Sequence, residues 1–278
     1  MDKKFYRIID MHTHIFPDKI AEKAVSSIGR YYHLDMWGQG TVSALLESGE
    51  KIGVSKYIVH SSATHVEQVI SINNFVSDTI KNHSCLVGFG TLHSSMENPA
   101  AEINRMIGLG LKGIKLHPEF QHFRIDDEEM MPVYKAIEGR LPLLIHMGDE
   151  NQDSSSPLRL SRVLDRFPEL VVIAAHFGGY RMWEDSMRYL VGRNLYMDTC
   201  SSLAFLDPDI AVGMIRRHGT DKFLFGTDYP MWDHEEELKR FLRLGLTEEE
   251  RIAILSGNAE ILLNSMSICA NCTPKRGC

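Results

Sequence analysis

The stretch "IIDMHTHIFP", residues 8–17, contains both a strand and the first sign of chemistry. It starts as an apolar run and then places Asp10, His12 and His14 at every second position before Pro17. Side chains two residues apart in a strand point to the same face. His12 and His14 are therefore expected to bind one metal ion together. Asp10 shares their face and is expected to hold a ligating imidazole by a hydrogen bond.

Seven more apolar or β-branched runs follow this first one. After a first interval of about 50 residues, they recur every 25–30 residues or so, about one strand and one helix each. Their near-continuous hydrophobicity is typical of parallel strands that are buried on both faces. The expected strands are residues 5–10, 56–62, 85–93, 111–118, 141–149, 170–179, 194–200 and 222–230.

The segments between these runs have apolar residues three and four positions apart, which predicts helices. The expected helices are residues 70–82, 99–110, 126–139, 156–168, 180–192, 207–219 and 233–245, with two more in the first interval and two after the last strand. Eight strand-helix units in about 265 residues predict a single-domain (β/α)8 TIM barrel. A doubly wound open sheet is the alternative, but no glycine-rich phosphate loop follows the first strand.

The composition limits the classes of partner. The net charge of −7 does not indicate a nucleic acid or an anionic membrane as the partner, so we expect a small-molecule substrate. No apolar run of about 18 residues predicts a transmembrane helix. The N-terminal segment lacks the long apolar core of a signal peptide.

The cysteines indicate a reducing compartment. There are five in the chain, an odd number, and three of them fall in the last ten residues, so a disulfide framework is not expected. We therefore expect a cytoplasmic protein, with a barrel domain over residues 1–265 and a cysteine-containing tail over residues 266–278. Within the tail, Cys269, Cys272 and Cys278 either contribute to a metal site or are incidental thiols of a polar segment.

Polar residues follow each expected strand. They are His12, His14, His60, His93, Lys115, His117, His146, His176, Asp198 and Asp228. A single histidine after a strand is usually a packed core imidazole, but in a barrel all these strand ends meet on one face. Imidazole and carboxylate groups suit Zn²⁺, Fe²⁺ or Mn²⁺. The set therefore predicts a metal centre at the carboxyl end of the barrel.

The motifs around these residues resemble those of the amidohydrolase superfamily. They are "DMHTH" (10–14), "GIKLHP" (113–118), "LLIHMGD" (143–149), "IAAHFGG" (173–179), "FGTDYP" (225–230) and "GNAEILL" (257–263). The resemblance extends from Asp10 to about Leu263. Three of the motifs are most similar to the branch that includes aminocarboxymuconate-semialdehyde and resorcylate decarboxylases, and "KLHP" is similar to the bridging-lysine strand of dihydroorotases. Together they are specific for the superfamily and not for a substrate.

The resemblance implies roles for individual residues. His12, His14 and Asp228 bind a buried metal, and His146 and His176 complete the nitrogen ligands. In members with one ion the residue at His146 is a ligand, and the residue at His176 is free to act on substrate or water. In members with two ions both bind the second ion. Related enzymes also often form dimers, so the resemblance allows a homodimer, but the sequence shows no interface.

Lys115 decides between these two arrangements. In members with two ions, a carboxylated lysine at this position bridges them, which requires a neutral amine and hence a lowered pKa. The alternatives are an anchor for a substrate carboxylate or a buried salt bridge. His117 shares the face of Lys115 and either lines the pocket or caps the strand. Sequence leaves one ion or two open.

The expected activity is metal-dependent hydrolysis of a small-molecule amide, lactone or ester. Zn²⁺ is the expected ion, with Mn²⁺ or Fe²⁺ possible, because a bound Zn²⁺ lowers the pKa of its water from 15.7 to about 7. Asp228 is expected to take up the proton of that water and deliver it to a leaving group. With a single ion, His176 is expected to be the proton shuttle.

Non-oxidative decarboxylation is the alternative reaction. It needs a cation to anchor the substrate acid, and Arg124, Arg159 and Arg181 follow strands from which they can reach the barrel mouth. Arg181, just past "HFGG", is the first candidate. Trp232 is expected either to wall the pocket, favouring an aromatic or apolar substrate, or to pack between helix and barrel.

Two further classes are weighed. A nuclease or phosphodiesterase on this barrel usually has a glutamate where this chain has Lys115, and the acidic balance disfavours a polyanion. A catalytically inactive metal-binding barrel is the alternative outside enzymology.

Overall fold

The computed structural model describes residues 6–269. Eight parallel strands follow one another around a single sheet in chain order, which confirms the predicted (β/α)8 barrel. The strands are β1 (Ile8–His14), β2 (Val54–His60), β3 (Leu86–Thr91), β4 (Gly113–Leu116), β5 (Leu143–Ile145), β6 (Val172–Ala174), β7 (Tyr196–Asp198) and β8 (Phe223–Leu224).

The barrel closes between β1 and the segment that follows β8. Met11 N–H donates to the Phe225 carbonyl at 2.9 Å, and His14 N–H donates to the Tyr229 carbonyl at 2.7 Å. In the other direction Asp228 N–H donates to the His12 carbonyl at 2.9 Å. The chain around Asp228 is thereby fixed against the strand that carries the first two histidines.

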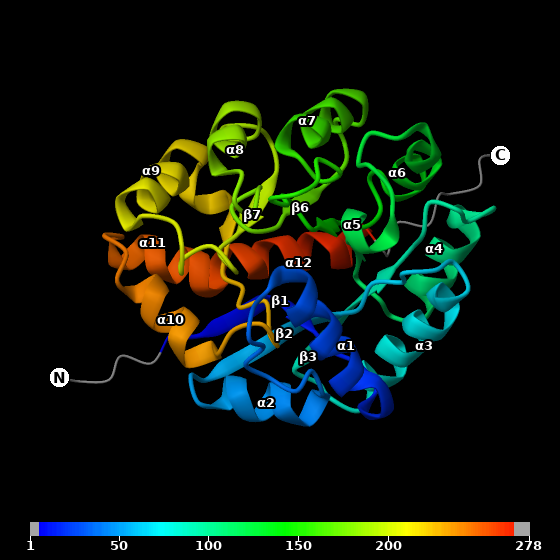
Figure 1. Ribbon diagram of the computed structural model, residues 1–278, viewed down its shortest axis with the longest axis horizontal. Coiled ribbons are helices and arrows are strands. Elements are labelled where there is room, and N and C mark those ends of the chain that lie inside the picture. Colours follow the sequence, from blue (N-terminus) through cyan, green and yellow to red (C-terminus); the bar gives the residue numbers. More distant parts are fainter. Residues whose placement is uncertain (1–5, 270–278) are drawn as a thin grey trace.

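Helices surround the strands (Figure 1). They are α1 (Asp18–Tyr32), α2 (Val42–Glu50), α3 (Gln68–Lys81), α4 (Pro99–Gly108), α5 (Pro118–Gln121), η1 (Glu128–Met130), α6 (Met131–Ile137), α7 (Pro157–Arg166), α8 (Trp183–Tyr189), α9 (Pro208–His218), η2 (Thr220–Lys222), α10 (His234–Leu242), α11 (Glu248–Ile252), η3 (Ala253–Gly257) and α12 (Asn258–Cys269). The outward-facing strand residues pack against these helices in one large apolar core.

A second apolar core fills the barrel interior. It contains inward-facing strand residues such as Ile9, Phe89 and Leu144, and it also contains Ala259 and Leu262 of α12. The α12 helix therefore packs against the interior residues of the strands. The histidines lie at or beyond the carboxyl ends of their strands, so this end of the barrel is the expected place of the functional site.

Several boundaries differ from the sequence-based expectation, and most strands are shorter than expected; β5, for example, is Leu143–Ile145 and not 141–149. The first strand runs over Ile8–His14 and not 5–10, because pairing with β2 continues as far as His14 and His60. The segment 247–257 is not one regular helix, since α11 passes into a wider π-helical turn at η3. Cys272 and Cys278 lie outside the described residues, so the predicted tail chemistry stays a prediction.

No helix within residues 6–269 has both the length and the apolar character needed to cross a bilayer.

Candidate active site

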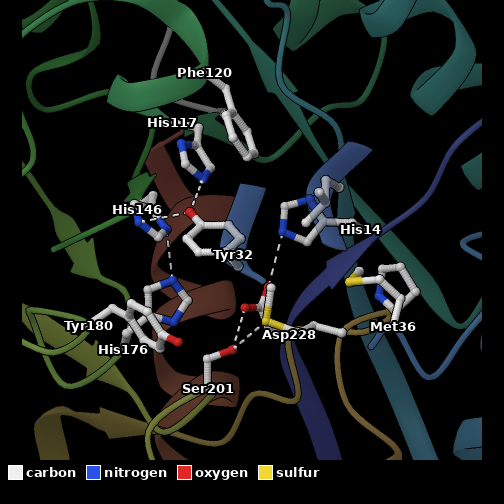
Figure 2. A pocket seen from close by; sticks show the side chains of 13 residues that line it. His14, Tyr32, Met36, His117, Phe120, His146, His176, Tyr180, Ser201 and Asp228 are labelled. Carbon is white, nitrogen blue, oxygen red and sulfur yellow. Dashed lines mark hydrogen bonds and ion pairs between the residues drawn. The ribbon is translucent and has the colours of Figure 1, made fainter. Parts of the chain in front are cut away.

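A cavity lies at the carboxyl ends of the strands (Figure 2). Its polar lining comes from strand ends and their following loops: His14, His117, His146, His176, Ser201 and Asp228. Its other lining is apolar or aromatic: Ile28, Tyr32, Met36, Phe120, Tyr180, Pro230 and Met231. None of these lining residues is an arginine or a lysine.

His12 lies under this cavity with its ring fixed in one orientation. Its Nδ1 is 2.7 Å from an Asp198 carboxylate oxygen, so Nδ1 carries the proton and donates it to Asp198. Its Nε2 lies 2.8 Å from Lys115 Nζ and 3.4 Å from Asp228 Oδ1. Burial would raise the pKa of Asp198, but His12 outweighs burial and lowers it. Asp198 thus fixes the tautomer that leaves Nε2 free to bind a cation.

Asp228 lies beside His12 and His14, on the segment after β8 that closes the barrel against β1. Its Oδ1 lies 3.2 Å from His14 Nε2, and its Oδ2 accepts a hydrogen bond from Ser201 Oγ at 2.5 Å. Burial would raise its pKa, yet His12, His14 and His176 hold the pKa well below the usual range of a carboxyl group. The backbone of Asp228 has φ 60°, a left-handed conformation that costs energy in a non-glycine residue and is typical of functional sites.

His146 and His176 face each other across the cavity floor. His146 Nε2 donates to the Gly148 carbonyl at 2.9 Å, so its Nδ1 is without a proton. That Nδ1 lies 2.9 Å from His176 Nε2. Burial lowers the pKa of His176 to about 4, so the ring is neutral at pH 7. The two ring nitrogens are thus in hydrogen-bond contact with each other at the cavity.

Lys115 is fully buried beside these groups. Burial lowers the pKa of its amine, against the opposing effect of Asp228 and Asp198. A lowered pKa is what carboxylation by CO₂ requires, so the direction agrees with the bridging role. The modification itself stays a prediction.

The donor set fits a divalent cation. His12, His14 and His60 have ligand atoms within 4.8 Å of one another, as have His12, His176, Cys200 and Asp228. Burial lowers the pKa of His14 to about 4, so it offers a neutral lone pair. Both ring nitrogens of buried His60 lack a hydrogen-bond partner, a cost that a bound ion nearby would relieve. Neutral imidazoles with one carboxylate suit Zn²⁺, Mn²⁺ or Fe²⁺.

Asp10 supports His12 differently from the expectation. Its Oδ1 accepts the backbone N–H of His12 at 3.0 Å and that of Thr227 at 3.1 Å, and its Oδ2 accepts from Thr227 Oγ1 at 2.5 Å. The ring of His12 is held by Asp198. Asp10 therefore ties β1 to the segment after β8 through the main chain.

The expected substrate-binding residues lie at different depths. His117 lines the cavity. Trp232 is outside the lining, but its Nε1–H donates to Ser201 Oγ at 2.8 Å and so supports a residue that does line it. The exposed Arg181 guanidinium lies over Phe205, 3.7 Å from the ring centre, outside the cavity lining.

The other two arginines are not placed at the cavity. Arg159 forms ion pairs with Asp126 at 2.5 Å and Asp153 at 2.6 Å. Arg124 is exposed, and its backbone N–H donates to Asp127.

Tyr32, Glu119 and Cys200 are site residues that the sequence did not indicate. Tyr32 comes from a helix inserted after β1, and no local pattern marks it. Glu119 is buried next to His117, where burial raises its pKa to about 7. Cys200 Sγ lies 3.2 Å from Nδ1 of both His12 and His176. The segment "KLHPE" offered a signal for Glu119, since a charged residue two positions after a strand-end histidine is close enough to face it.

Family membership follows from the whole length of the chain. The sequence model of the amidohydrolase family matches residues 9–264. The chain belongs to the amidohydrolase family. The match includes every strand-end histidine described above and none of the tail cysteines. The barrel and its site therefore form the family unit of this amidohydrolase.

Solved structures share the fold of this amidohydrolase at 15–17% sequence identity. A 5-carboxyvanillate decarboxylase from Sphingomonas paucimobilis is 17% identical, with a TM-score of 0.70 over 93% of this chain and 99% of its own. A dihydroxybenzoic acid decarboxylase from a Polaromonas species, with bound manganese and 2-nitroresorcinol, is 16% identical, with a TM-score of 0.72 over 93% and 97%. A probable 2-pyrone-4,6-dicarboxylic acid hydrolase from Acinetobacter baumannii is 15% identical, with a TM-score of 0.69 over 93% and 99%.

Proposed function

We propose that this amidohydrolase is a metal-dependent, non-oxidative decarboxylase of a small aromatic carboxylic acid. The observation that carries the proposal is the division of the cavity into two chemically different parts. The floor holds neutral imidazoles, Asp228 and, beneath them, Lys115, whereas the walls are aromatic rings and methionines. The proposal places a planar ring between the walls and its carboxylate on the floor.

The lining combines a few polar groups with aromatic and apolar side chains, which is typical of a small-molecule site. The absence of arginine and lysine among the lining residues restricts the anionic group to the floor, where a cation would be held and where Lys115 lies. The two decarboxylases with this fold act, by their names, on aromatic acids, and one of them binds manganese. This reading replaces hydrolysis, our first expectation from the sequence, as the preferred one.

A single ion would be held by His12, His14 and Asp228, with His146 completing the donors and His176 left free to act on the substrate. When bound, it supplies positive charge that holds substrate oxygens and withdraws electrons from the ring. We propose manganese or zinc as the ion. Whether Lys115 joins as a bridging carbamate or acts as an amine beside the substrate carboxylate depends on the number of ions.

The chain's own groups then have defined tasks. The bond between the ring carbon and the carboxylate breaks, its electron pair stays on the ring carbon, and that carbon takes up a proton. Asp228, on the cavity floor, is placed to accept a proton from the incoming acid or phenol and return it to the ring carbon. His176 faces the same part of the floor and stabilises the negative charge on the substrate oxygens through Nε2. The apolar walls exclude water.

Hydrolysis of a lactone or a cyclic ester is the second candidate. The same floor suits it, and the probable pyrone dicarboxylic acid hydrolase has the same fold. That hydrolase acts, by its name, on a compound with two carboxylates. The cavity lining of this chain contains no arginine or lysine that could bind a second carboxylate.

The test is a parallel screen of the protein loaded with Mn²⁺ or Zn²⁺. One arm follows CO₂ release from hydroxybenzoic acids, and the other follows hydrolysis of lactones, esters and amides. We expect CO₂ and the decarboxylated phenol in equal amounts, and no product from Asp228→Asn. Hydrolysis without decarboxylation would establish the second candidate instead. Metal binding without turnover in either arm would favour an inactive barrel.

A further inference from the structure

Tyr32 brings a hydroxyl group into the cavity from outside the barrel. It is the last residue of α1, the helix inserted between β1 and β2. Its hydroxyl lies 3.0 Å from His117 Nε2 and 3.3 Å from His146 Nε2. In Figure 2 the hydroxyl points toward these two rings, with His14 on the other side of the tyrosine ring. A phenol therefore stands directly beside the metal ligands we propose.

The two histidines do not use all of the hydroxyl's bonding capacity. A tyrosine hydroxyl has one proton to donate and two lone pairs that accept. His146 Nε2 carries a proton, since it donates to the Gly148 carbonyl, so toward Tyr32 it acts as a donor. His117 takes one more position. One position is left for an atom in the cavity that Tyr32 lines.

His117 is held so that it faces Tyr32. Its ring is stacked between Phe120 and His146, with ring centres 4.0 Å apart on both sides and interplanar angles of 14° and 9°. Stacking fixes the plane of the ring and leaves only two orientations, related by a 180° rotation about the Cβ–Cγ bond.

Glu119 determines this rotation. Its Oε1 accepts a hydrogen bond from Ser155 Oγ at 2.5 Å, which holds the carboxyl group in place. Its Oε2 faces His117 Nδ1 at 3.5 Å, and both of these buried atoms lack any other hydrogen-bond partner. The pair Nδ1–Oε2 thus orients the ring so that Nε2 points at Tyr32.

A second cation site at His117, Glu119 and His146 is the competing interpretation, because their ligand atoms lie within 4.8 Å of one another. An imidazole binds a cation in the plane of its ring. The planes of His117 and His146 are nearly parallel, with ring centres 4.0 Å apart, so no nearby point lies in both. The cluster is therefore a hydrogen-bonding arm and not a metal site.

We propose that Tyr32 contacts a substrate oxygen in the cavity and that Glu119 is a positioning residue that acts on Tyr32 through His117. This inference rests on the proposed function, since it assigns a substrate contact to the same cavity. It names the oxygen-bearing ring substituents of the substrate, rather than its carboxylate, as the groups that Tyr32 recognises.

Tyr31 provides a matched control. It is the neighbouring residue of α1, and its hydroxyl donates to Asp149 at 2.9 Å and accepts from Gln152 at 2.9 Å, outside the cavity lining. We expect Tyr32→Phe to lower kcat/KM about 10- to 100-fold, as for one lost hydrogen bond to a charged or strongly polar group. Tyr31→Phe should change it less than about 3-fold. Equal losses in both variants would mean that the tyrosines only dock the helix, and would overturn the inference.

The role of Glu119 is tested by a double-mutant cycle. Glu119→Gln alone should lower kcat/KM, and the Tyr32→Phe/Glu119→Gln double variant should be no worse than Tyr32→Phe alone, because both changes act on one contact. Metal content and affinity should be unchanged in all three variants. Additive losses, or loss of metal in Glu119→Gln, would show that Glu119 does not act through Tyr32.

Binding of 2-nitroresorcinol to the metal-loaded protein separates this inference from the proposed reaction. We expect Tyr32→Phe to weaken binding at least about 10-fold and Tyr31→Phe to leave it unchanged, whether or not the wild type decarboxylates any acid. If the protein showed this binding difference but no turnover, the proposed decarboxylation would be wrong and the proposed contact of Tyr32 would stand. Equal binding by wild type and Tyr32→Phe, or no binding by wild type, would show that the proposed contact of Tyr32 is wrong.

Discussion

The cavity has a floor and a roof that are built differently. The floor is delivered by strand ends, and its groups hold one another: His12 is bound to Asp198 at 2.7 Å, and Asp228 is bound to Ser201 at 2.5 Å. The roof consists of Tyr32 from α1 and of His117 and Glu119 after β4, and the Tyr32 hydroxyl keeps one bonding position beyond its contacts with His117 and His146. The floor is therefore preorganised for one ion, whereas the roof keeps bonding capacity in reserve for a ligand.

The largest effect should come from the floor carboxylate. Asp228→Asn keeps the shape and the contact with Ser201 but removes the proton acceptor, so we expect kcat to fall by about 10³-fold or more. Steady-state kinetics with the best aromatic acid, together with a metal assay, measures this change. Asp209→Asn, at an exposed position in α9, is the control and should behave as wild type. Retention of more than about a tenth of the wild-type kcat in Asp228→Asn would remove its assigned role.

The second prediction compares a floor residue with a roof residue directly. Asp198→Asn should weaken metal affinity about 10- to 100-fold, because His12 loses the carboxylate that fixes its tautomer. Glu119→Gln should leave metal affinity unchanged. Titration of the metal-free variants with Mn²⁺ measures both. If the two variants lost affinity equally, the division into a metal-holding floor and a ligand-holding roof would be wrong.

A third effect concerns pH and the metal-free protein. The folded pKa values of His14 and His176 are lowered to about 4, below the unfolded value of about 6.5. Between these pH values the unfolded chain binds more protons, so the free energy of unfolding falls as the pH drops. Glu119 and Glu237 act oppositely, since burial raises their pKa values to about 7 and about 8, and their contribution is lost as the pH rises through that range.

Stability of the metal-free protein should therefore be highest at about pH 6.5. Urea unfolding at pH 5, 6.5 and 8 measures it, and we expect a decrease of about 1 kcal/mol or more at pH 5, since five buried histidines have lowered pKa values: His14, His60, His117, His146 and His176. A protein as stable at pH 5 as at pH 6.5 would show that these rings are not buried as neutral groups.

The smallest effect is expected at the rim. Arg181 lies outside the lining over Phe205, so its charge reaches an incoming acid only through solvent. Arg181→Met should raise KM by a few-fold at low ionic strength and have no effect at high salt, because exposed charges are screened. KM measured across a salt series checks this. A large loss of kcat in this variant would place Arg181 inside the cavity and revive it as the carboxylate anchor.

The same division explains what could be predicted from the sequence. The floor could be predicted, because strand periodicity places His12 and His14 on one face. Barrel topology then brings His146, His176 and Asp228 to the same end. The fold could be predicted from eight buried runs alternating with helices. These are properties of regular elements, in which spacing along the chain determines direction in space.

The roof could not be predicted in this way. Tyr32 reaches the cavity only because α1 folds back over the strand ends, and Glu119 faces His117 only because a four-residue helix, α5, turns the chain there. Asp10 shows a related limit. The strand face predicted for it was correct, but its carboxylate accepts hydrogen bonds from backbone N–H groups, since Nδ1 of His12 is already bonded to Asp198 on β7. Contacts between elements remote in sequence decide such partners.

The central claim is that the floor gathers its imidazoles and Asp228 around a divalent cation. The most direct measurement is calorimetric titration of the metal-stripped protein with Mn²⁺ and Zn²⁺, with His12→Gln/His14→Gln as the reference. The account predicts at least one tightly bound ion per wild-type chain, and loss of that ion in the double variant. A correctly folded wild-type protein that binds neither ion, or a double variant that binds as wild type does, would contradict it.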